Sequence, residues 1–168
     1  LYVSVEFPTW APGWKYIYFR GPTDVEGKTV HTRGSVKLPK QEATAVLERW
    51  LQPVDKQSVS FTLDLSADRD AAFTLAAMGV NTGAAFKGGK VTLVPPEGDT
   101  AELELPFGRG SFGLCKELQL RDVEGDLTRI TLDPPLKLSY DGQARIALAG
   151  ERLPKDQPAK ATVTFQFP

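Results

Sequence analysis

Apolar and polar residues alternate along most of this chain, and a period of two is that of half-buried β-strands. The clearest example covers residues 59–65, where Val, Phe and Leu alternate with Ser, Thr and Asp. Similar patterns or apolar runs occupy the segments 3–7, 14–20, 30–38, 90–94, 102–105, 118–120, 130–132, 145–148 and 162–167. The alternation therefore predicts an all-β fold with about ten to twelve short antiparallel strands.

Glycine, proline and aspartate gather between these segments, as turns require. The clusters include residues 88–89, 95–99, 124–126, 133–135 and 141–142. Thirteen prolines and fifteen glycines, spaced in this way, favour a β-sandwich of the jelly-roll type over an α/β fold. The length of 168 residues fits one domain over 1–168, and a start at Leu1 suggests a module of a longer protein.

One segment has the period of a helix. Between residues 40 and 52 the apolar residues fall at i, i+3, i+4, i+7 and i+8. They are Ala43, Val46, Leu47, Trp50 and Leu51. Pro39 precedes the segment and Pro53 ends it. The pattern predicts one short amphipathic helix over about 40–52 that covers an end or face of the sandwich, with Trp50 in its buried stripe.

Charge and cysteine content limit the partners and the compartment. Twenty basic residues are spread among twenty-one acidic ones, giving a net charge of −1, so we expect no nucleic-acid partner. No apolar run has the length of a membrane-spanning helix, so we expect no membrane partner either. Cys115 is the only cysteine and forms no internal disulfide, which is compatible with a cytosolic protein and with many bacterial secreted domains.

Aromatic residues are concentrated near the start of the chain. Six of the sixteen lie between Phe7 and Arg20, including two of the three tryptophans. If 14–20 is a strand, Trp14, Tyr16 and Tyr18 project from one face at intervals of roughly 6.6–6.8 Å, and the residues between them take the other face. A core needs only one of these faces, so the other is a candidate aromatic platform.

Such a platform fits a sugar. Pyranose rings present C–H bonds that pack on indole and phenol rings, and their hydroxyl groups bond to polar side chains nearby. The polar residues close enough in sequence to do so are Glu6, Lys15, Arg20 and Asp24. The alternative is that Trp10 and Trp14 fill the end of the sandwich and belong to its core.

Two acidic clusters are candidates for calcium, which takes six to eight oxygen ligands. The first consists of Asp64, Asp68 and Asp70, and the second, which we favour, of Asp122, Glu124 and Asp126. Neither matches the EF-hand pattern, because the glycine and the distal glutamate are missing at the required offsets. No motif requires a cofactor, so a structural calcium ion in the loop at Asp122 is the metal prediction.

Carboxylates, His31 and Cys115 are the remaining candidates for chemistry. A glycoside hydrolase needs two carboxyl groups across a cleft, and Glu102, Glu104 and Asp64 lie on the polar sides of predicted strands. That placement is also typical of an exposed strand face. A pairing of His31 with Cys115 stays open, although the apolar neighbours of Cys115 are typical of a buried, inert thiol.

With many short strands, one helix and the cluster of Trp10, Trp14, Tyr16 and Tyr18, the chain resembles β-sandwich carbohydrate-binding modules and accessory sandwich domains of bacterial glycoside hydrolases. The resemblance implies a non-catalytic module that binds a polysaccharide or oligosaccharide and targets a catalytic domain in the same chain. It also implies a secreted, periplasmic or extracellular location. Two alternatives remain: a structural domain that packs on a catalytic domain, and a glycan-active enzyme that uses carboxylates.

Overall fold

The computed structural model describes residues 4–106 and 108–168, and the chain is all-β, as the alternation predicts. The strands of these residues are β1 (Ser4–Glu6), β2 (Thr9–Ala11), β3 (Lys15–Ile17), β4 (Thr23–Glu26), β5 (Thr29–Lys37), β6 (Thr44–Pro53), β7 (Ser58–Ala67), β8 (Ala71–Ala72), β9 (Leu75–Asn81), β10 (Lys90–Val94), β11 (Ala101–Glu104), β12 (Gly110–Arg121), β13 (Leu127–Tyr140), β14 (Ala144–Ala149), β15 (Arg152–Leu153) and β16 (Ala159–Gln166). These sixteen strands exceed the predicted ten to twelve, because several are only two to four residues long. A short 3₁₀ helix covers Ala84–Phe86, and no helix in the described residues is long and apolar enough to cross a membrane.

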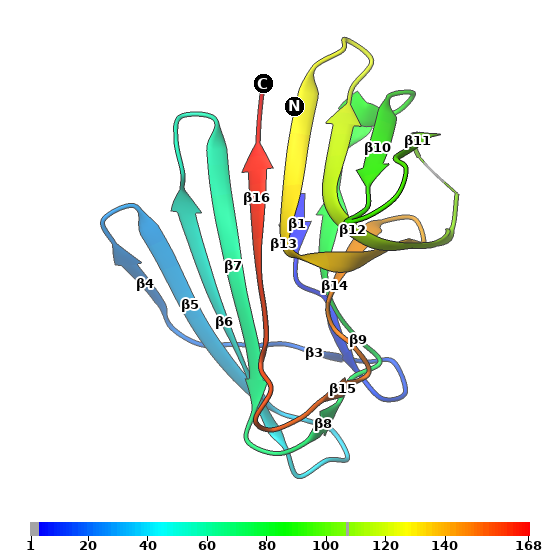
Figure 1. Cartoon of the computed structure of the whole chain (residues 1–168). Helices are drawn as coiled ribbons and strands as arrows, with labels where there is room; N and C mark the ends of the chain where they lie inside the picture. Colours follow the sequence, from blue (N-terminus) through cyan, green and yellow to red (C-terminus); the bar gives the residue numbers. More distant parts are fainter. Residues whose placement is uncertain (1–3, 107) are drawn as a thin grey trace.

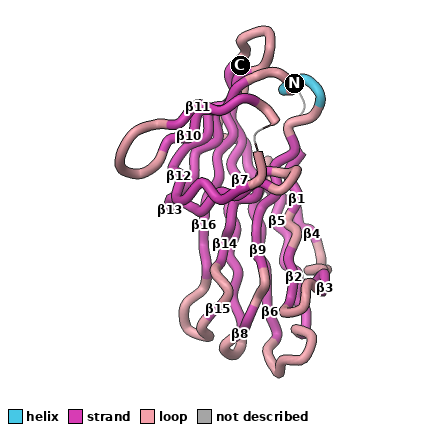
Figure 2. The backbone as a smooth tube through the Cα atoms, turned by 90° about the vertical axis from the view of Figure 1, so that its right-hand side faces the viewer, coloured by secondary structure: helices cyan, strands magenta, loops and turns pink. Residues whose placement is uncertain are grey.

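The strands pair antiparallel in a sheet that curls into a half-barrel. Ten of them follow the order β3-β2-β9-β14-β13-β16-β7-β6-β5-β4, which Figure 1 shows as a curved wall. Strand β1 pairs with β9 beside β2, and β10 and β11 join through β12, which pairs with β13. Strands β8 and β15 pair with each other at one end, below the long strands in Figure 2. The curl brings parts of the segment 6–20 close to β5 and β6.

The sheet changes neighbours along β13. Residues 129–133 of this strand pair with β16, and residues 137–140 pair with β14. Pro134 and Pro135 lie between the two parts, where their lack of an N–H group breaks no ladder. The turn predicted at 133–135 is therefore wrong, because the strand runs through the prolines while its partner changes.

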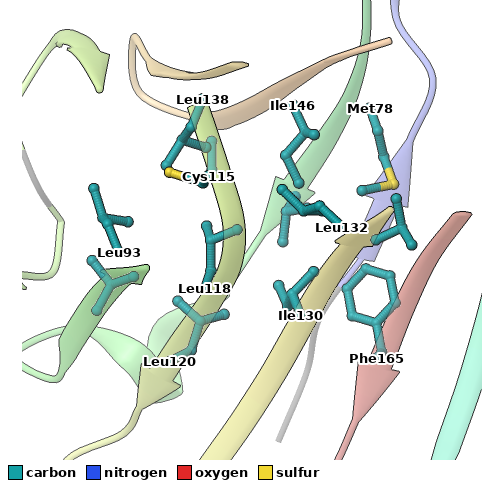
Figure 3. Packing of buried hydrophobic residues seen from close by; sticks show 14 of the residues in the cluster. Met78, Leu93, Cys115, Leu118, Leu120, Ile130, Leu132, Leu138, Ile146 and Phe165 are labelled. Carbon is teal, nitrogen blue, oxygen red and sulfur yellow. The ribbon is translucent and has the colours of Figure 1, made fainter. Parts of the chain in front are cut away.

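Two clusters of buried apolar side chains fill the inside of the curl. In the larger one, Met78, Leu132, Ile146 and Phe165 from four strands point into the same space (Figure 3). Burial of each such side chain contributes about 1.5–3 kcal/mol. The smaller cluster joins β2 and β3 to β6 and β7, and Ile17 of β3 belongs to it. This second cluster therefore anchors the aromatic segment on the sheet.

The helix predicted over about 40–52 is wrong. This segment contains β6, which lies between β5 and β7 and pairs with both along its length. Its apolar residues also fit a strand, because Ala45 and Leu47 are buried on one side while Thr44 and Val46 on the other side are only half-buried. As a strand, the segment forms backbone hydrogen bonds with two neighbouring strands, which a helix could not do. Tertiary pairing therefore overrides the helical period.

The expected burial of Trp50 in a helical stripe is also wrong. Trp50 is half-buried and lies on the side of β6 opposite to Leu47. Its ring stacks on that of His31, with centroids 4.9 Å apart and planes inclined by 12°. The two residues are direct partners in the pairing of β5 with β6, which explains the contact.

Candidate functional site

The aromatic segment folds into a hairpin. Strand β2 pairs with β3, and Trp10 lies directly opposite Tyr16. Gly13 and Trp14 lie in the turn with φ values of 83° and 58°. This left-handed region is open to glycine, whereas tryptophan adopts it only at an energetic cost. The strand predicted over 14–20 is therefore limited to β3.

Four rings form a row along the hairpin and the residue that follows it, which we call the aromatic row: Trp14, Trp10, Tyr16 and Tyr18. Neighbouring ring centroids in this order are 5.9, 4.6 and 5.6 Å apart. Trp10 is only 7% exposed, whereas Trp14, Tyr16 and Tyr18 are 63%, 50% and 64% exposed. Both interpretations of the cluster thus apply, each to different residues: Trp10 is core, and the other three present their rings to solvent.

Ile17 determines which way the row faces. Its side chain is buried in the smaller core cluster together with Leu47 and Leu65. Because successive side chains of a strand point to opposite sides, Tyr16 and Tyr18 are directed away from that cluster. Phe19 is partly buried and packs against the cluster. The predicted division of this segment into two faces therefore matches the structure at these residues.

Trp10 is also held by a cation. The guanidinium carbon of Arg145, on β14, lies 4.9 Å from the centroid of the Trp10 ring. Nη1 of Arg145 lies 2.6 Å from Oδ2 of Asp141. A guanidinium over an indole contributes about 0.5–1 kcal/mol at exposed sites and more when desolvated. Arg145 and Asp141 are not among the predicted site residues, because only the pairing of β14 with β9 brings them to the row.

A groove of about 320 Å³ opens beside the two tyrosines. Its lining comes from β1 and the residues after it, from β3 and the residues after it, and from β6. The lining residues are Glu6, Phe7, Pro8, Tyr16, Ile17, Tyr18, Phe19, Arg20, Leu47 and Arg49. Aromatic rings and charged groups therefore meet in one concave surface.

Four of the six predicted binding residues line this groove, namely Glu6, Tyr16, Tyr18 and Arg20. Trp10 and Trp14 lie outside it and continue the aromatic row. Lys15 and Asp24, the further candidates for hydrogen bonds, are exposed and do not line the groove. Asp24 instead pairs with His31 in the register of β4 with β5.

Close packing against Gly34 places one wall of the groove. The chain after Tyr18 lies against β5, where the N–H of Ser35 donates to the carbonyl of Arg20 at 3.4 Å. A Cβ atom built at Gly34 would lie 2.6 Å from the carbonyl carbon of Phe19. Glycine therefore permits the approach that sets Phe19 and Arg20 beside the groove.

Arg49 is a groove residue that the sequence patterns did not indicate. Its guanidinium carbon lies 5.7 Å from the centroid of the Phe7 ring. Burial lowers the pKa of the guanidinium from its ordinary value, and Nε has no hydrogen-bond partner. No ion pair joins Arg49 to any residue among 4–106 and 108–168. The pattern that could have indicated Arg49 is the alternation in β6, which puts it on the same side of the strand as Ala45 and Leu47.

The favoured acidic loop is a hydrogen-bonded turn. Oδ1 of Asp122 accepts the backbone N–H groups of Glu124 at 3.0 Å and of Asp126 at 2.9 Å, as aspartate commonly does in turns. In the part of the chain that the structure describes, no group of three or more His, Cys, Asp or Glu side chains is placed to hold a metal. Calcium binding stays a prediction of the sequence, and the geometry of this loop adds no support.

The carboxylates considered for catalysis lie next to lysines. Nζ of Lys90 is 2.6 Å from Oε1 of Glu102, and the pKa of Lys90 is raised by that hydrogen bond and, more weakly, by the charge of Glu104. Oδ2 of Asp64 is 3.8 Å from Nζ of Lys160. Strands β7 and β11, which carry these acids, are not neighbours in the sheet. Glu102 and Asp64 are therefore salt-bridged residues on strand faces that are exposed or partly exposed.

His31 and Cys115 do not meet. Cys115 is buried in the larger core cluster, as Figure 3 shows, and burial raises the pKa of its thiol. His31 lies on β5, where Nε2 is 3.0 Å from Oε2 of Glu48 and the ring stacks on Trp50. The paired nucleophile that the sequence left open is therefore not formed.

Comparison with known proteins identifies the fold. No family model and no curated protein match the sequence. Among solved structures, the chain is similar to part of the 4-alpha-glucanotransferase from Thermococcus litoralis, with a TM-score of 0.60 and 12% sequence identity. The similarity covers 98% of this chain and 27% of that chain, so this chain spans about a quarter of the enzyme's length. At this identity the two share a fold, and their residues are not equated.

Proposed function

We propose that this chain is a non-catalytic carbohydrate-binding module that stacks sugar rings on Trp14, Tyr16 and Tyr18. The observation that carries the proposal is that three rings of the aromatic row are each at least half exposed and that two of them, Trp14 and Tyr16, pack on the buried Trp10. Large exposed aromatic surfaces on folded domains mark binding sites. Each ring that stacks on a sugar contributes on the order of 1 kcal/mol beyond the burial of area.

The groove favours a sugar over a protein partner. The buried core of a protein interface is depleted in charged residues other than arginine. Here Glu6, Arg20 and Arg49 line a concave surface next to Tyr16 and Tyr18. We expect these charged groups to bond to the hydroxyl groups of a ring that lies on the tyrosines.

The proposal extends to the context of the module. We infer a β-sandwich of the jelly-roll type over 1–168 that belongs to a longer, secreted bacterial protein with a polysaccharide-active catalytic domain. The fold shared with a quarter of a glucanotransferase chain supports this context. A tethered module raises the local concentration of substrate at the catalytic domain without any new catalytic contact.

A glycan array followed by isothermal titration calorimetry tests the proposal. We expect binding to at least one polysaccharide, weakened roughly fivefold or more by Trp14→Ala, since about 1 kcal/mol is lost. Tyr18→Ala should have a similar effect. Trp50→Ala is the matched control, because it removes an indole that stacks on His31 and does not line the groove, and it should leave the affinity unchanged. Absence of binding to every glycan, or full affinity in the Trp14→Ala/Tyr18→Ala double variant, would overturn the proposal.

A second candidate is a structural domain that packs on a catalytic domain through the aromatic row. The similarity to only a quarter of a larger enzyme chain favours it. Acrylamide quenching of tryptophan fluorescence separates the two candidates, because Trp14 is the most exposed tryptophan of the chain. A Trp14 signal that is quenched in this chain and protected in the full-length protein would favour the structural domain.

A further inference from the structure

Among the described residues that line the groove beside the tyrosines, Arg49 is a partly buried cation without an ion pair. We propose that Arg49, together with Arg20 at the rim, binds the carboxylate of a uronic acid residue while the sugar chain lies on Tyr16 and Tyr18. The module would therefore select acidic polysaccharides. This inference rests on the proposed function and specifies its ligand class.

A comparison of the arginines carries the argument. In the described residues, only Arg49 and Arg145 are partly buried, and all other arginines are exposed. Arg145 has its carboxylate, Oδ2 of Asp141, at 2.6 Å. Arg49 has none, although desolvation of a charge is costly unless a partner compensates for it. The space in front of Arg49 is instead an open groove.

The surroundings of Arg49 prepare it for an anion. The ring of Phe7 lies 5.7 Å from its guanidinium carbon, and Leu47 lines the groove beside it, so the charge is flanked by apolar groups. Its Nε–H is unused. A planar guanidinium presents parallel N–H groups that match the two oxygens of a carboxylate, and partial exclusion of water strengthens such bonds.

The charge balance of the groove points the same way. Its charged lining consists of Arg49, Arg20 and Glu6, which leaves a net positive charge. Glu6 is exposed and forms no ion pair with Arg49. A neutral sugar would offer only hydroxyl groups to Arg49, whereas a carboxylate also supplies the missing counterion.

Oligogalacturonides and their fully methyl-esterified forms provide a direct test, because the two share a backbone and differ in charge. We expect the native protein to bind the acidic form roughly tenfold or more tightly than the ester in calorimetry at low salt. Arg49→Met should remove this preference, because methionine keeps the packing on Phe7 but not the charge. Arg129→Met is the matched control, since Arg129 is exposed on β13 and does not line the groove.

Binding of a carboxylate to Arg49 can also be measured by NMR in the native protein. The Nε–H signal of Arg49 in a nitrogen-15 spectrum should shift on addition of galacturonate and stay in place on addition of galactose. Equal affinity for the acidic form and the ester, or a preference for the acidic form that survives in Arg49→Met, would overturn the inference. The stacking proposal would still stand if Trp14→Ala weakens binding. Tighter binding of sulfated than of carboxylated oligosaccharides would overturn the choice of a carboxylate. Failure of every acidic and neutral glycan to bind would overturn both proposals.

Discussion

The indole of Trp10 packs against the phenol of Tyr16 across the hairpin of β2 and β3, with centroids 4.6 Å apart and planes inclined by 60°. One ring of the pair is buried and the other is half exposed. A buried ring thus serves as the support for an exposed one. Cross-strand aromatic pairs of this kind contribute roughly 0.2–1 kcal/mol relative to alanine pairs.

This relationship predicts that the two tryptophans of the row contribute unequally to stability. Trp10→Ala should lower the free energy of unfolding by about 3–5 kcal/mol, as expected for a buried tryptophan, and should weaken glycan binding because the support is lost. Trp14→Ala should lower it by less than about 1 kcal/mol, because most of that ring is in solvent. Urea unfolding followed by circular dichroism measures both values. Equal costs would contradict the assignment of Trp10 to the core.

Gly34 should be intolerant of a side chain. Gly34→Ala puts a Cβ atom 2.6 Å from the carbonyl carbon of Phe19, so the segment of Phe19 and Arg20 must shift. We expect a loss of about 1–3 kcal/mol of stability, as for other overpacked sites, together with weaker binding in the groove. Gly150→Ala is the control, because a Cβ there meets nothing within 4 Å. Thermal unfolding of both variants makes the comparison, and equal melting temperatures would speak against the close contact.

Arg49 should contribute to binding and not to stability. Arg49→Met removes a desolvated charge without a counterion and keeps an apolar side chain against Phe7, so the free energy of unfolding should be unchanged or higher. Arg145→Met removes a paired cation from the ring of Trp10 and should destabilise the fold by about 1 kcal/mol. Chemical unfolding of the two variants measures both free energies of unfolding. A larger loss for Arg49→Met than for Arg145→Met would contradict the unpaired state of Arg49.

Cys115 should make stability fall at alkaline pH. Burial raises the pKa of its thiol above the ordinary value of 9.0. The folded chain therefore retains this proton where the unfolded chain has lost it. The contribution is complete below the unfolded pKa and is lost as the pH rises through the folded pKa.

Unfolding free energies measured from pH 7 to pH 10 should therefore decline more steeply for the native chain than for Cys115→Ala. Iodoacetamide should react with the thiol in urea and only slowly in the folded protein at pH 8. Parallel pH profiles of the two proteins, or rapid alkylation of the folded chain, would contradict a protonated, buried Cys115.

Local alternation predicts much of this fold, and the exceptions have physical causes. Strands such as β7 and β16 are predicted correctly because one side of each is apolar and the other polar. The segment 43–51 satisfies the helical and the extended period together, so its own residues do not choose between them. Pairing with β5 and β7 makes the segment a strand, and these two strands lie before and after it in the sequence. The same pairing moves Trp50 from a predicted core to a stack on His31.

For the candidate site, the sequence by itself determined that Ile17 and the tyrosines on either side of it face opposite ways, because the period of a strand is two. It also determined the concentration of aromatic rings within fourteen positions. Only the tertiary structure decided that Trp10 is buried while Trp14 is not, and that Arg49 joins Tyr16 and Arg20 in one groove. These residues are separated by about thirty positions, and their contact depends on the curl of the whole sheet, which no local pattern encodes.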